Sequence, residues 1–454
     1  MPGAARRRRA ERARRSEGST ALILAGRALT RGKLQHVEIA IDDAGRIQSV
    51  AKAVRGEPRH DVGDAVILPA ATDLHVHFRE PGGPAGAETF SSGTIGAALG
   101  GVSLVGEMPN THPPVTDLES WQEKADLVHG RAAVDVLLYA APVVERALPA
   151  LSRHAGGFKV YLSPTTGIES VPAFADLPAL WDRLVGLHLP VSVHAEDPTR
   201  FVAMRPPSSA IDWNAQRPGE AEEAALAELT RAPRGLRLHA AHVTTPVGVR
   251  TMRRAALSFE ATPHHLLLSD RAGPDASFKV NPPLRSETER AGLWEAFVRG
   301  EVPIVASDHA PHTREAKALP FDQAPSGVPG VETLLPVLLS KVRSGDLDLA
   351  VLQAAACERP ALWLGQPLGR LVPGHRANLL VVDFTKRSRV EGPRLRSPCG
   401  WTPFEGWEAI RPREHYRDGV RIVEDGEYVG RPQGQVVRPE YAPGEAAGAP
   451  TPVD

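Results

Sequence analysis

The middle of the chain alternates short apolar runs with longer amphipathic or Ala-rich segments. Eight runs rich in Val, Ile and Leu are candidate strands, at residues 66–77, 102–108, 133–140, 157–162, 190–196, 236–243, 258–265 and 303–310. Helix-like stretches separate several of them, at residues 119–130, 173–187, 219–232, 246–257 and 285–300. Apolar strands that alternate with helices indicate a parallel sheet covered on both faces. Eight such repeats predict an α/β fold of the (β/α)8, or TIM barrel, type.

Both ends of the chain have a different texture, in which short apolar or alternating pieces are broken by Gly and Asp. This texture covers residues 20–67 and returns within residues 366–440. It indicates antiparallel strands. We therefore expect the two ends to build one small β-sandwich domain together, with the barrel at residues 68–365 inserted between them. Residues 1–19 are expected to form a disordered Arg-rich extension and residues 441–454 a flexible tail.

Composition narrows the class of protein without naming a function. Of the 454 residues, 42% are apolar and 24% are charged, which is ordinary for a globular domain, and no apolar run is long enough to cross a bilayer. Two cysteines, Cys357 and Cys399, are too few for a disulfide framework and favour a cytoplasmic location. The Arg-rich start could contact nucleic acid or a membrane surface, but a disordered extension is the simpler interpretation. We therefore expect neither a nucleic acid nor a membrane as partner.

Candidate metal ligands fall at the ends of the predicted strands, where a barrel places its active site. His75 and His77 are two residues apart, so in extended backbone they share one face. An isolated pair of this kind is equally compatible with buried histidines or a surface strand. Residues that can bind a metal also lie at the ends of four later strands. They are Lys159, His194, His242 and Asp308. Four histidines and a carboxylate at one barrel mouth favour a site for Zn²⁺ or a similar divalent ion.

Lys159 is the unusual member of this set. It lies between Phe158 and Val160, where an unpaired cation would be costly to bury. A neutral lysine can react with carbon dioxide to give an anionic carbamate that bridges two metals. The alternative is an ammonium that extends from the strand end to solvent. Because histidines surround it, we expect Lys159 to be a ligand.

Ordered motifs then connect the chain to a known family. They are HVHFREPG, GEMPNT, GFKVYL, VHAE, AHVTTP, TPHHLLLS, KVNPPLR, SDHAPHT, SGVPGVET and WTPFEG, which span about residues 60 to 410. In these motifs the chain resembles the cyclic amidohydrolases, and within them the dihydroorotases of the bacterial type and of the fused eukaryotic pyrimidine enzyme. The resemblance also implies the composite β-domain. One departure is GPAGAET after REPG, where relatives usually carry a larger polar or basic residue before the glutamate.

The resemblance implies a role for each ligand-type residue. His75, His77 and Asp308 would hold one Zn²⁺, His194 and His242 would hold a second, and carboxylated Lys159 would bridge the two ions. A hydroxide between the metals would attack the ring amide carbonyl of dihydroorotate. Asp308 would take the hydroxide proton and return it to the leaving ring nitrogen, which gives N-carbamoyl-L-aspartate. The biosynthetic direction is the reverse, ring closure with loss of water.

Substrate identity is expected to depend on residues that hold no metal. The resemblance places Arg79 and Asn110 on the substrate carboxylate, and Asn281, His312 and the backbone at Gly327 on the ring and the carboxylate. The alternatives are a surface salt bridge from Arg79 to Glu80 and a plain turn role for Asn110. Thr165 and Thr166 fall where relatives have a loop over the substrate, although a simple turn fits equally well.

Two other functions compete with this interpretation. An allantoinase or hydantoinase would share the barrel and the metals, but its substrate lacks the carboxylate that Arg79 and Asn110 would bind. A non-catalytic barrel that scaffolds aspartate transcarbamoylase is disfavoured because all six ligand types are present. An active barrel could still form such a complex, and family habit suggests a homodimer.

Overall fold

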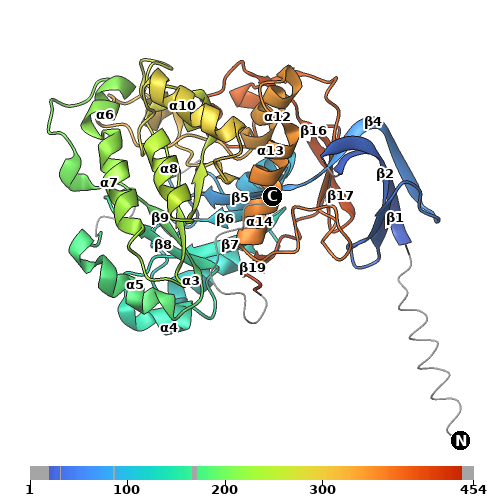
Figure 1. Ribbon diagram of the computed structural model, residues 1–454, viewed down its shortest axis with the longest axis horizontal. Coiled ribbons are helices and arrows are strands. Elements are labelled where there is room, and N and C mark those ends of the chain that lie inside the picture. Colours follow the sequence, from blue (N-terminus) through green and yellow to red (C-terminus); the bar gives the residue numbers. More distant parts are fainter. Residues whose placement is uncertain (1–19, 31, 85–86, 166–170, 442–454) are drawn as a thin grey trace, which may run out of the picture.

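The computed structural model describes residues 20–30, 32–84, 87–165 and 171–441. Eight parallel strands form a nearly closed barrel, which confirms the predicted fold class (Figure 1). In barrel order they are β5 (Ala71–Val76), β6 (Val102–Glu107), β7 (Asp135–Ala140), β8 (Gly157–Tyr161), β9 (Pro190–His194), β10 (Arg237–Ala240), β11 (Ser258–Ala261) and β12 (Ile304–Val305). The barrel closes where Val76 and His309 form a parallel bridge, and the backbone N–H of His77 donates to the His309 carbonyl at 2.7 Å.

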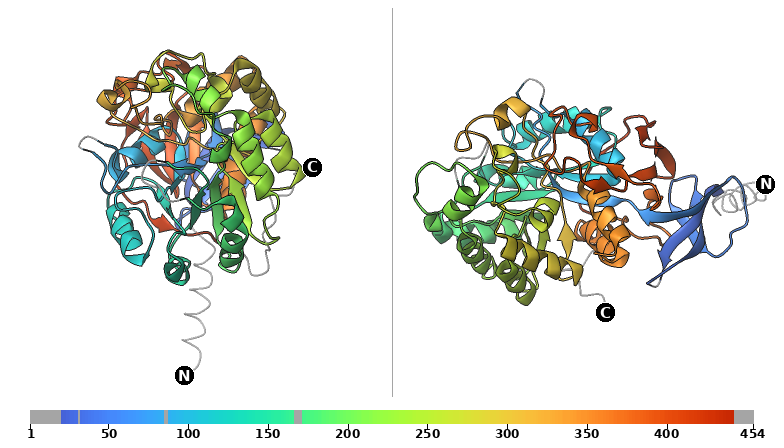
Figure 2. Two further views of the ribbon diagram at one scale, coloured as in Figure 1. Left: turned by 90° about the vertical axis from the view of Figure 1, so that its left-hand side faces the viewer. Right: turned by 90° about the horizontal axis from the view of Figure 1, so that it is seen from above.

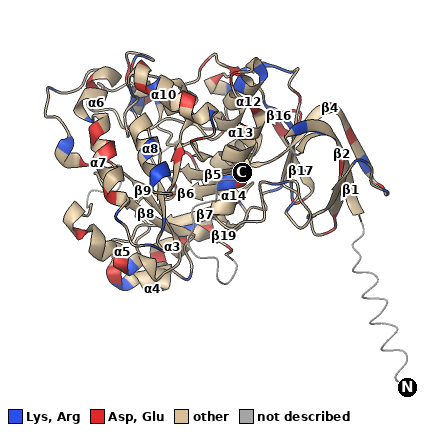
Figure 3. Ribbon diagram, viewed as in Figure 1, with Lys and Arg blue, Asp and Glu red and all other residues tan. Residues whose placement is uncertain are grey.

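Helices cover the outside of the barrel, and local signals in the sequence fix where several of them begin. Capping boxes start α2, α3 and α10 at Thr89, Asp117 and Ser286. The helices are α2 (Phe90–Leu99), α3 (Leu118–Val128), α4 (Leu148–Leu151), α5 (Leu177–Val185), α6 (Ala210–Gln216), α7 (Gly219–Leu229), α8 (Pro246–Arg254), α9 (Pro263–Leu267), α10 (Glu287–Val298), α11 (Arg314–Lys317), α12 (Leu334–Ser344), α13 (Leu349–Gln353) and α14 (Arg359–Trp363). Both charge signs are interspersed over these helices, in keeping with the net charge of −1 (Figure 3).

Strands from both chain ends form one eight-stranded sheet beside the barrel, so the predicted composite β-domain is present (Figures 1 and 2). In sheet order the strands are β18 (Glu427–Tyr428), β17 (Val420–Glu424), β16 (Pro412–Arg417), β13 (Leu379–Val382), β4 (Arg59–Pro69), β1 (Thr20–Thr30), β2 (Lys33–Asp42) and β3 (Ile47–Ala51). The two ends meet where β13 pairs with β4 in antiparallel register. The sheet has its own apolar core, to which both ends contribute side chains such as Ile39 and Leu379.

The border between the two parts differs in detail from the expected one. The apolar run 66–77 is divided, because β4 continues to Pro69 in the β-domain and β5 begins at Ala71. Between β13 and β16 the chain leaves the sheet to form the short pair β14 (Ser388–Arg389) and β15 (Glu408–Ala409). Near the C-terminus, β19 (Val436–Val437) pairs with β7 of the barrel. The predicted extension 1–19 and residues 442–454 of the predicted tail lie outside the described residues.

The helices are too short or too polar to cross a bilayer, in every part of the chain that the structure describes.

Candidate active site

Three side chains from the first and last barrel strands meet at the barrel mouth. His75 lies in β5, His77 follows directly after it, and Asp308 comes three residues after β12. The Asp308 Oδ1 atom lies 3.3 Å from His75 Nε2 and 3.2 Å from His77 Nε2. One ligand atom from each of the three buried residues lies within 4.8 Å of the others, so this group could hold a metal ion.

Strands on the other side of the barrel bring in the remaining predicted ligands. His194 Nδ1 and His242 Nε2 face each other at 3.0 Å, and the His242 ring centroid lies 5.3 Å from that of His75. Lys159 Nζ lies 3.5 Å from His75 Nε2. All six residues line one cavity of about 40 Å³, which we call the metal cavity. The structure therefore brings together every residue that the sequence suggested as a ligand.

Burial sets the protonation of this cluster. It lowers the pKa of His75, His77 and His242 well below the ordinary value, so each imidazole is neutral and keeps a lone pair. Burial also lowers the pKa of Lys159 to about 8, and it raises the pKa of Asp308 to about 7 although Lys159 opposes that rise. The cluster is thus rich in neutral nitrogen donors, with a lysine and an aspartate that can change protonation near neutral pH.

Acceptors behind the histidines determine which ring nitrogen faces the cavity. His75 Nδ1 donates to Glu260 Oε1 at 2.8 Å and His77 Nδ1 donates to Asn110 Oδ1 at 2.7 Å, which leaves both Nε2 lone pairs toward Asp308. His194 Nε2 donates to Glu196 Oε2 at 2.8 Å, so its Nδ1 lone pair faces His242. Such acceptors orient metal-binding histidines in many proteins, and here they select the nitrogens that point into the metal cavity.

Backbone conformation also turns these side chains inward. Arg79, His242 and Asp308 have φ angles of 61°, 37° and 44°, in the left-handed region that residues with a Cβ rarely adopt. Strained backbone of this kind gathers at functional sites, where surrounding contacts hold it in place. The strand ends are therefore shaped for the site as well as for the barrel.

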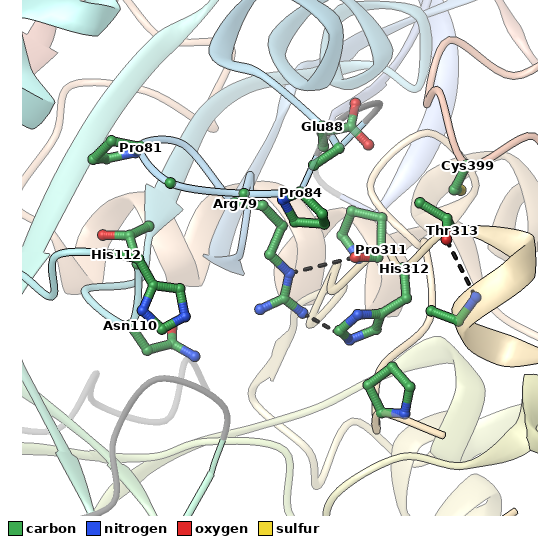
Figure 4. Close-up of a pocket in the computed structure, with 16 residues that line it drawn as sticks. Arg79, Pro81, Pro84, Glu88, Asn110, His112, Pro311, His312, Thr313 and Cys399 are labelled. Atoms are coloured by element: carbon green, nitrogen blue, oxygen red, sulfur yellow. Dashed lines mark hydrogen bonds between the residues drawn. The ribbon is translucent and has the colours of Figure 1, made fainter. Parts of the chain in front are cut away.

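A second, larger cavity of about 230 Å³ adjoins the metal cavity, and we call it the outer cavity (Figure 4). Arg79 and Asn110 line both cavities. In Figure 4 the Arg79 guanidinium points toward His312, and its Nε donates to the Pro311 carbonyl at 3.3 Å. Glu80 instead pairs with Arg131 at 2.8 Å, so the alternative Arg79–Glu80 salt bridge is not formed.

His312 leaves the Arg79 protons available to an anion. Its Nε2 lies 2.9 Å from the Ser326 carbonyl and 3.1 Å from Arg79 Nη2. A carbonyl only accepts, so His312 Nε2 carries the proton and donates a hydrogen bond to the Ser326 carbonyl. This nitrogen then has no lone pair that could accept an N–H of Arg79. Burial lowers the pKa of His312 to about 2, which keeps the imidazole neutral. The guanidinium therefore provides the positive charge at the border of the two cavities.

The other predicted substrate residues lie in the lining of the metal cavity, and we call the part of the lining that contains Asn281, Ser326 and Gly327 the substrate wall. Asn281 and Gly327 line the metal cavity, and Asn281 Oδ1 accepts a hydrogen bond from Trp213 Nε1 at 3.0 Å. Gly327 has a φ of 131°, and a Cβ there would approach the Ala310 carbonyl oxygen to 2.5 Å, so only glycine fits. Thr165 also lines this cavity, whereas Thr166 lies outside the described residues.

Sequence reasoning missed three residues of the site. Glu260 and Glu196 are fully buried carboxylates that orient ligands, and their signal was an acidic residue within or just after an apolar strand. Tyr161 lines the metal cavity two residues after Lys159, and its buried hydroxyl has no hydrogen-bond partner among the described residues. Burial raises the pKa of this phenol well above its ordinary value, so it remains a donor.

Comparisons with known proteins agree with this geometry. A family model described as dihydro-orotase-like matches residues 64–160. The dihydroorotase of Halobacterium salinarum is 36% identical over 431 residues, which cover 92% of this chain and 99% of the relative. That of a Geobacillus species is 33% identical and covers 83% of this chain and 92% of the relative. Among solved structures, L-hydantoinase from Arthrobacter aurescens has a TM-score of 0.84 at 26% identity, with 92% of this chain and all of that chain covered.

The barrel, its ligand-lined mouth and these likenesses together define an amidohydrolase, a hydrolase that acts on a cyclic amide. Solved hydantoinases at 22% identity share the fold, with TM-scores of 0.81, and support nothing finer. The full-length relatives are more specific. The chain belongs to the dihydroorotase family.

Proposed function

We propose that this chain catalyses the reversible cyclisation of N-carbamoyl-L-aspartate to (S)-dihydroorotate and water, a step of pyrimidine (UMP) biosynthesis. The observation that carries this substrate is the position of Arg79, whose guanidinium lies at the border of the metal cavity and the outer cavity. A ring bound over the ligands could thus extend its carboxylate to Arg79 and Asn110. Neutral cyclic amides offer no partner for that charge.

Two Zn²⁺ ions fit the donor set of the metal cavity. His75, His77 and Asp308 would hold one ion, and His194 and His242 would hold the other. The fit rests on the neutral imidazoles of His75 and His77, whose Nε2 lone pairs point into the cavity because their Nδ1 atoms donate to Glu260 and Asn110. When bound, such ions supply Lewis acidity and lower the pKa of water.

Lys159 would bridge the two ions as its carbamate. Its ammonium is fully buried and its lowered pKa of about 8 leaves a neutral amine fraction near neutral pH, which is the form that reacts with carbon dioxide. The resulting anion would also remove an uncompensated cation from the barrel interior. Mass spectrometry under native conditions would detect one added carbon dioxide, and the Lys159→Ala variant should lack it.

Asp308 is the proposed proton carrier. Its Oδ1 atom lies 3.3 Å from His75 Nε2 and 3.2 Å from His77 Nε2, and its pKa of about 7 suits both acceptance and release of a proton near neutral pH. In ring opening it would accept the proton of the attacking water and deliver it to the departing ring nitrogen. Ring closure would use the same group in the opposite order.

Substrate recognition would involve Arg79, Asn110 and the substrate wall. Arg79 and Asn110 would bind the carboxylate, with the guanidinium held through its Nε by the Pro311 carbonyl, while Asn281, His312 and the backbone at Gly327 would contact the ring and the carboxylate. A homodimer and a complex with aspartate transcarbamoylase stay predictions of the family resemblance, and a cytoplasmic location stays a prediction from the low cysteine count.

The deciding experiment combines metal analysis with a spectrophotometric assay on three substrates. Purified protein is expected to contain a divalent metal and to prefer dihydroorotate over dihydrouracil and allantoin. The second candidate, a hydantoinase-like amidase, is favoured only by the likeness to L-hydantoinase at a TM-score of 0.84. Faster turnover of dihydrouracil or allantoin would replace our substrate assignment with that one.

A further inference from the structure

A loop without regular secondary structure forms part of the substrate wall. It runs from Phe321 to Gly327, and its residues Ser326 and Gly327 line the metal cavity. Its apolar anchoring is small, because only Phe321 and Ala324 pack into a cluster with residues such as Ala276. This apolar packing involves only the first half of the loop. It does not explain how Ser326 and Gly327, at the other end, are held at the cavity.

Lys317, the last residue of α11, holds the end of this loop. Its ammonium donates to the carbonyls of Pro325 and Gly327, both at 3.0 Å, and to that of Lys279 at 3.2 Å. An ammonium group has three protons, so all three are used. The side chain is buried and also lies over the Trp401 ring, 5.6 Å from its centroid.

Lys279 holds the start of the loop in the same manner. Its ammonium donates to the carbonyls of Phe321, Asp322 and Ala324 at 2.7, 3.3 and 2.8 Å. Its own carbonyl accepts the Lys317 ammonium and the backbone N–H of Gly327, the latter at 2.9 Å. The two lysines therefore form one continuous support along the loop.

These bonds are unusual in using carbonyl dipoles in place of carboxylates. No ion pair joins either ammonium to an acidic side chain within the part of the chain that the structure describes. Burial lowers the pKa of both groups, that of Lys317 to about 7. Carbonyl-bound ammonium groups fix backbone, since each bond specifies where a peptide oxygen must lie.

We propose that Lys279 and Lys317 are positioning residues, which hold the backbone of residues 321–327 at the substrate wall without touching substrate. Lys279 is two residues from Asn281, and the Ser326 carbonyl accepts a hydrogen bond from His312 Nε2. The same support therefore also places Asn281 and His312, two of the proposed substrate side chains. The inference rests on the proposed function of this wall. It adds the reason that KVNPPLR and the segment after SDHAPHT each contain a buried lysine.

The test compares Lys317→Met, which keeps the apolar stem, with Lys341→Met. Lys341 is a matched control because it also lies over a tryptophan ring, 5.8 Å from the Trp407 centroid, and its Nζ lies 3.8 Å from the Asp346 carboxylate. We expect Lys317→Met to raise KM for dihydroorotate about tenfold or more, with a smaller change in kcat and unchanged metal content. Lys279→Met should act in the same direction, and Lys341→Met should match the parent protein.

Hydrogen exchange supplies a readout that does not depend on turnover. The Gly327 amide should exchange faster in Lys317→Met, while amides of the barrel strands keep their protection. Parent-like KM and exchange would overturn the inference, as would loss of metal in proportion to activity. If the parent protein fails to turn over dihydroorotate, the proposed function fails and the exchange measurement still decides the role of the lysines.

A variant that does not fold is also informative. Lys317→Gln keeps two N–H donors and should give an intermediate effect on KM and on exchange at Gly327. If Lys317→Met, Lys317→Gln and Lys279→Met all fail to fold, the lysines support the whole barrel and the proposed local role is wrong.

Discussion

Buried charge gathers at both ends of the barrel, but the two clusters differ in the kind of partner that their central carboxylate has. At the amino end, Asp135 begins β7 and accepts hydrogen bonds from Arg376 and Arg417, both at 2.6 Å, and from the Gln435 amide at 3.0 Å. Arg376 in turn binds both oxygens of Asp418, at 2.6 and 2.7 Å. Every oxygen of this carboxylate has a cationic partner, and the cluster joins the barrel to the β-domain.

The cluster at the mouth is buried throughout, whereas Arg376 and Asp418 of the first cluster are partly exposed. His242 Nδ1 and the Tyr161 hydroxyl have no partner among the described residues, and the pKa values of Asp308 and Lys159 are displaced toward neutral pH. Burial alone therefore does not distinguish a structural cluster from a functional one. The type of partner does: the Asp135 carboxylate has a guanidinium on each oxygen, whereas Asp308 lies against the imidazoles of His75 and His77, which burial keeps neutral and which leave its charge for a bound cation to compensate.

The sharpest test of this contrast is Asp308→Asn. An amide can neither accept the proton nor replace the carboxylate ligand, so we expect turnover in both directions to fall by about three to four orders of magnitude. The thermal unfolding midpoint of the metal-free protein should stay within a few degrees of the parent. Turnover of dihydroorotate at the parent rate would remove Asp308 from the mechanism.

Arg79→Met should have the next largest effect, and it should depend on substrate. Loss of a charge-assisted contact to the carboxylate should lower kcat/KM for dihydroorotate by about two to three orders of magnitude, and leave that for dihydrouracil nearly unchanged. Steady-state kinetics on both substrates decide the point. An equal loss on the two would mean that Arg79 supports the cavity and does not recognise the carboxylate.

Asp135→Asn should give the opposite phenotype from Asp308→Asn. It leaves the buried Arg417 and the partly buried Arg376 facing a neutral amide, although Arg376 keeps its bonds to Asp418, so the free energy of unfolding should fall by about 3 kcal/mol, as measured with urea. Metal content and kcat/KM at 25 °C should match the parent, because the change lies at the far end of the barrel. A large kinetic defect without destabilisation would contradict the division between the two clusters.

The smallest expected effect concerns pH and His415, which lies at the same end as Asp135. His415 Nδ1 donates to the Ala98 carbonyl at 2.8 Å, and burial lowers its pKa to about 4 from about 6.5 in the unfolded chain. Between these values the unfolded state binds the proton and the folded state does not, so stability falls as pH decreases from 6.5 toward 4. The hydrogen bond from His415 Nδ1 to the Ala98 carbonyl does not require the imidazole to be charged.

His415→Gln tests this assignment, since glutamine can donate to Ala98 and does not titrate. Between pH 7 and pH 5 the parent should lose about 2 kcal/mol more stability than the variant in urea unfolding. Identical slopes for the two proteins would assign the acid sensitivity to other buried histidines.

Local patterns predicted the architecture well, because each strand carries its own apolar run and several helices carry their own caps. The predicted ligands also share a local signal, a polar residue at a strand end. What failed to emerge were contacts between particular side chains far apart in the sequence: Glu260 lies 185 residues from His75, whose tautomer it sets. The expected border between residues 67 and 68 falls short of the end of β4, because pairing with β13 continues that strand to Pro69.

That pairing of β4 with β13 also has a consequence for biosynthesis. The two strands are about 300 residues apart, so a chain emerging from the ribosome carries β4 with one open edge until nearly all of the barrel has been made. An unpaired apolar edge is a site of aggregation. Truncated or stalled chains with an open β4 edge should therefore be bound by chaperones or degraded by proteases. The last strands to be translated thus cover the open edge of β4, and only a chain translated almost to its end can leave synthesis with β4 paired on both sides.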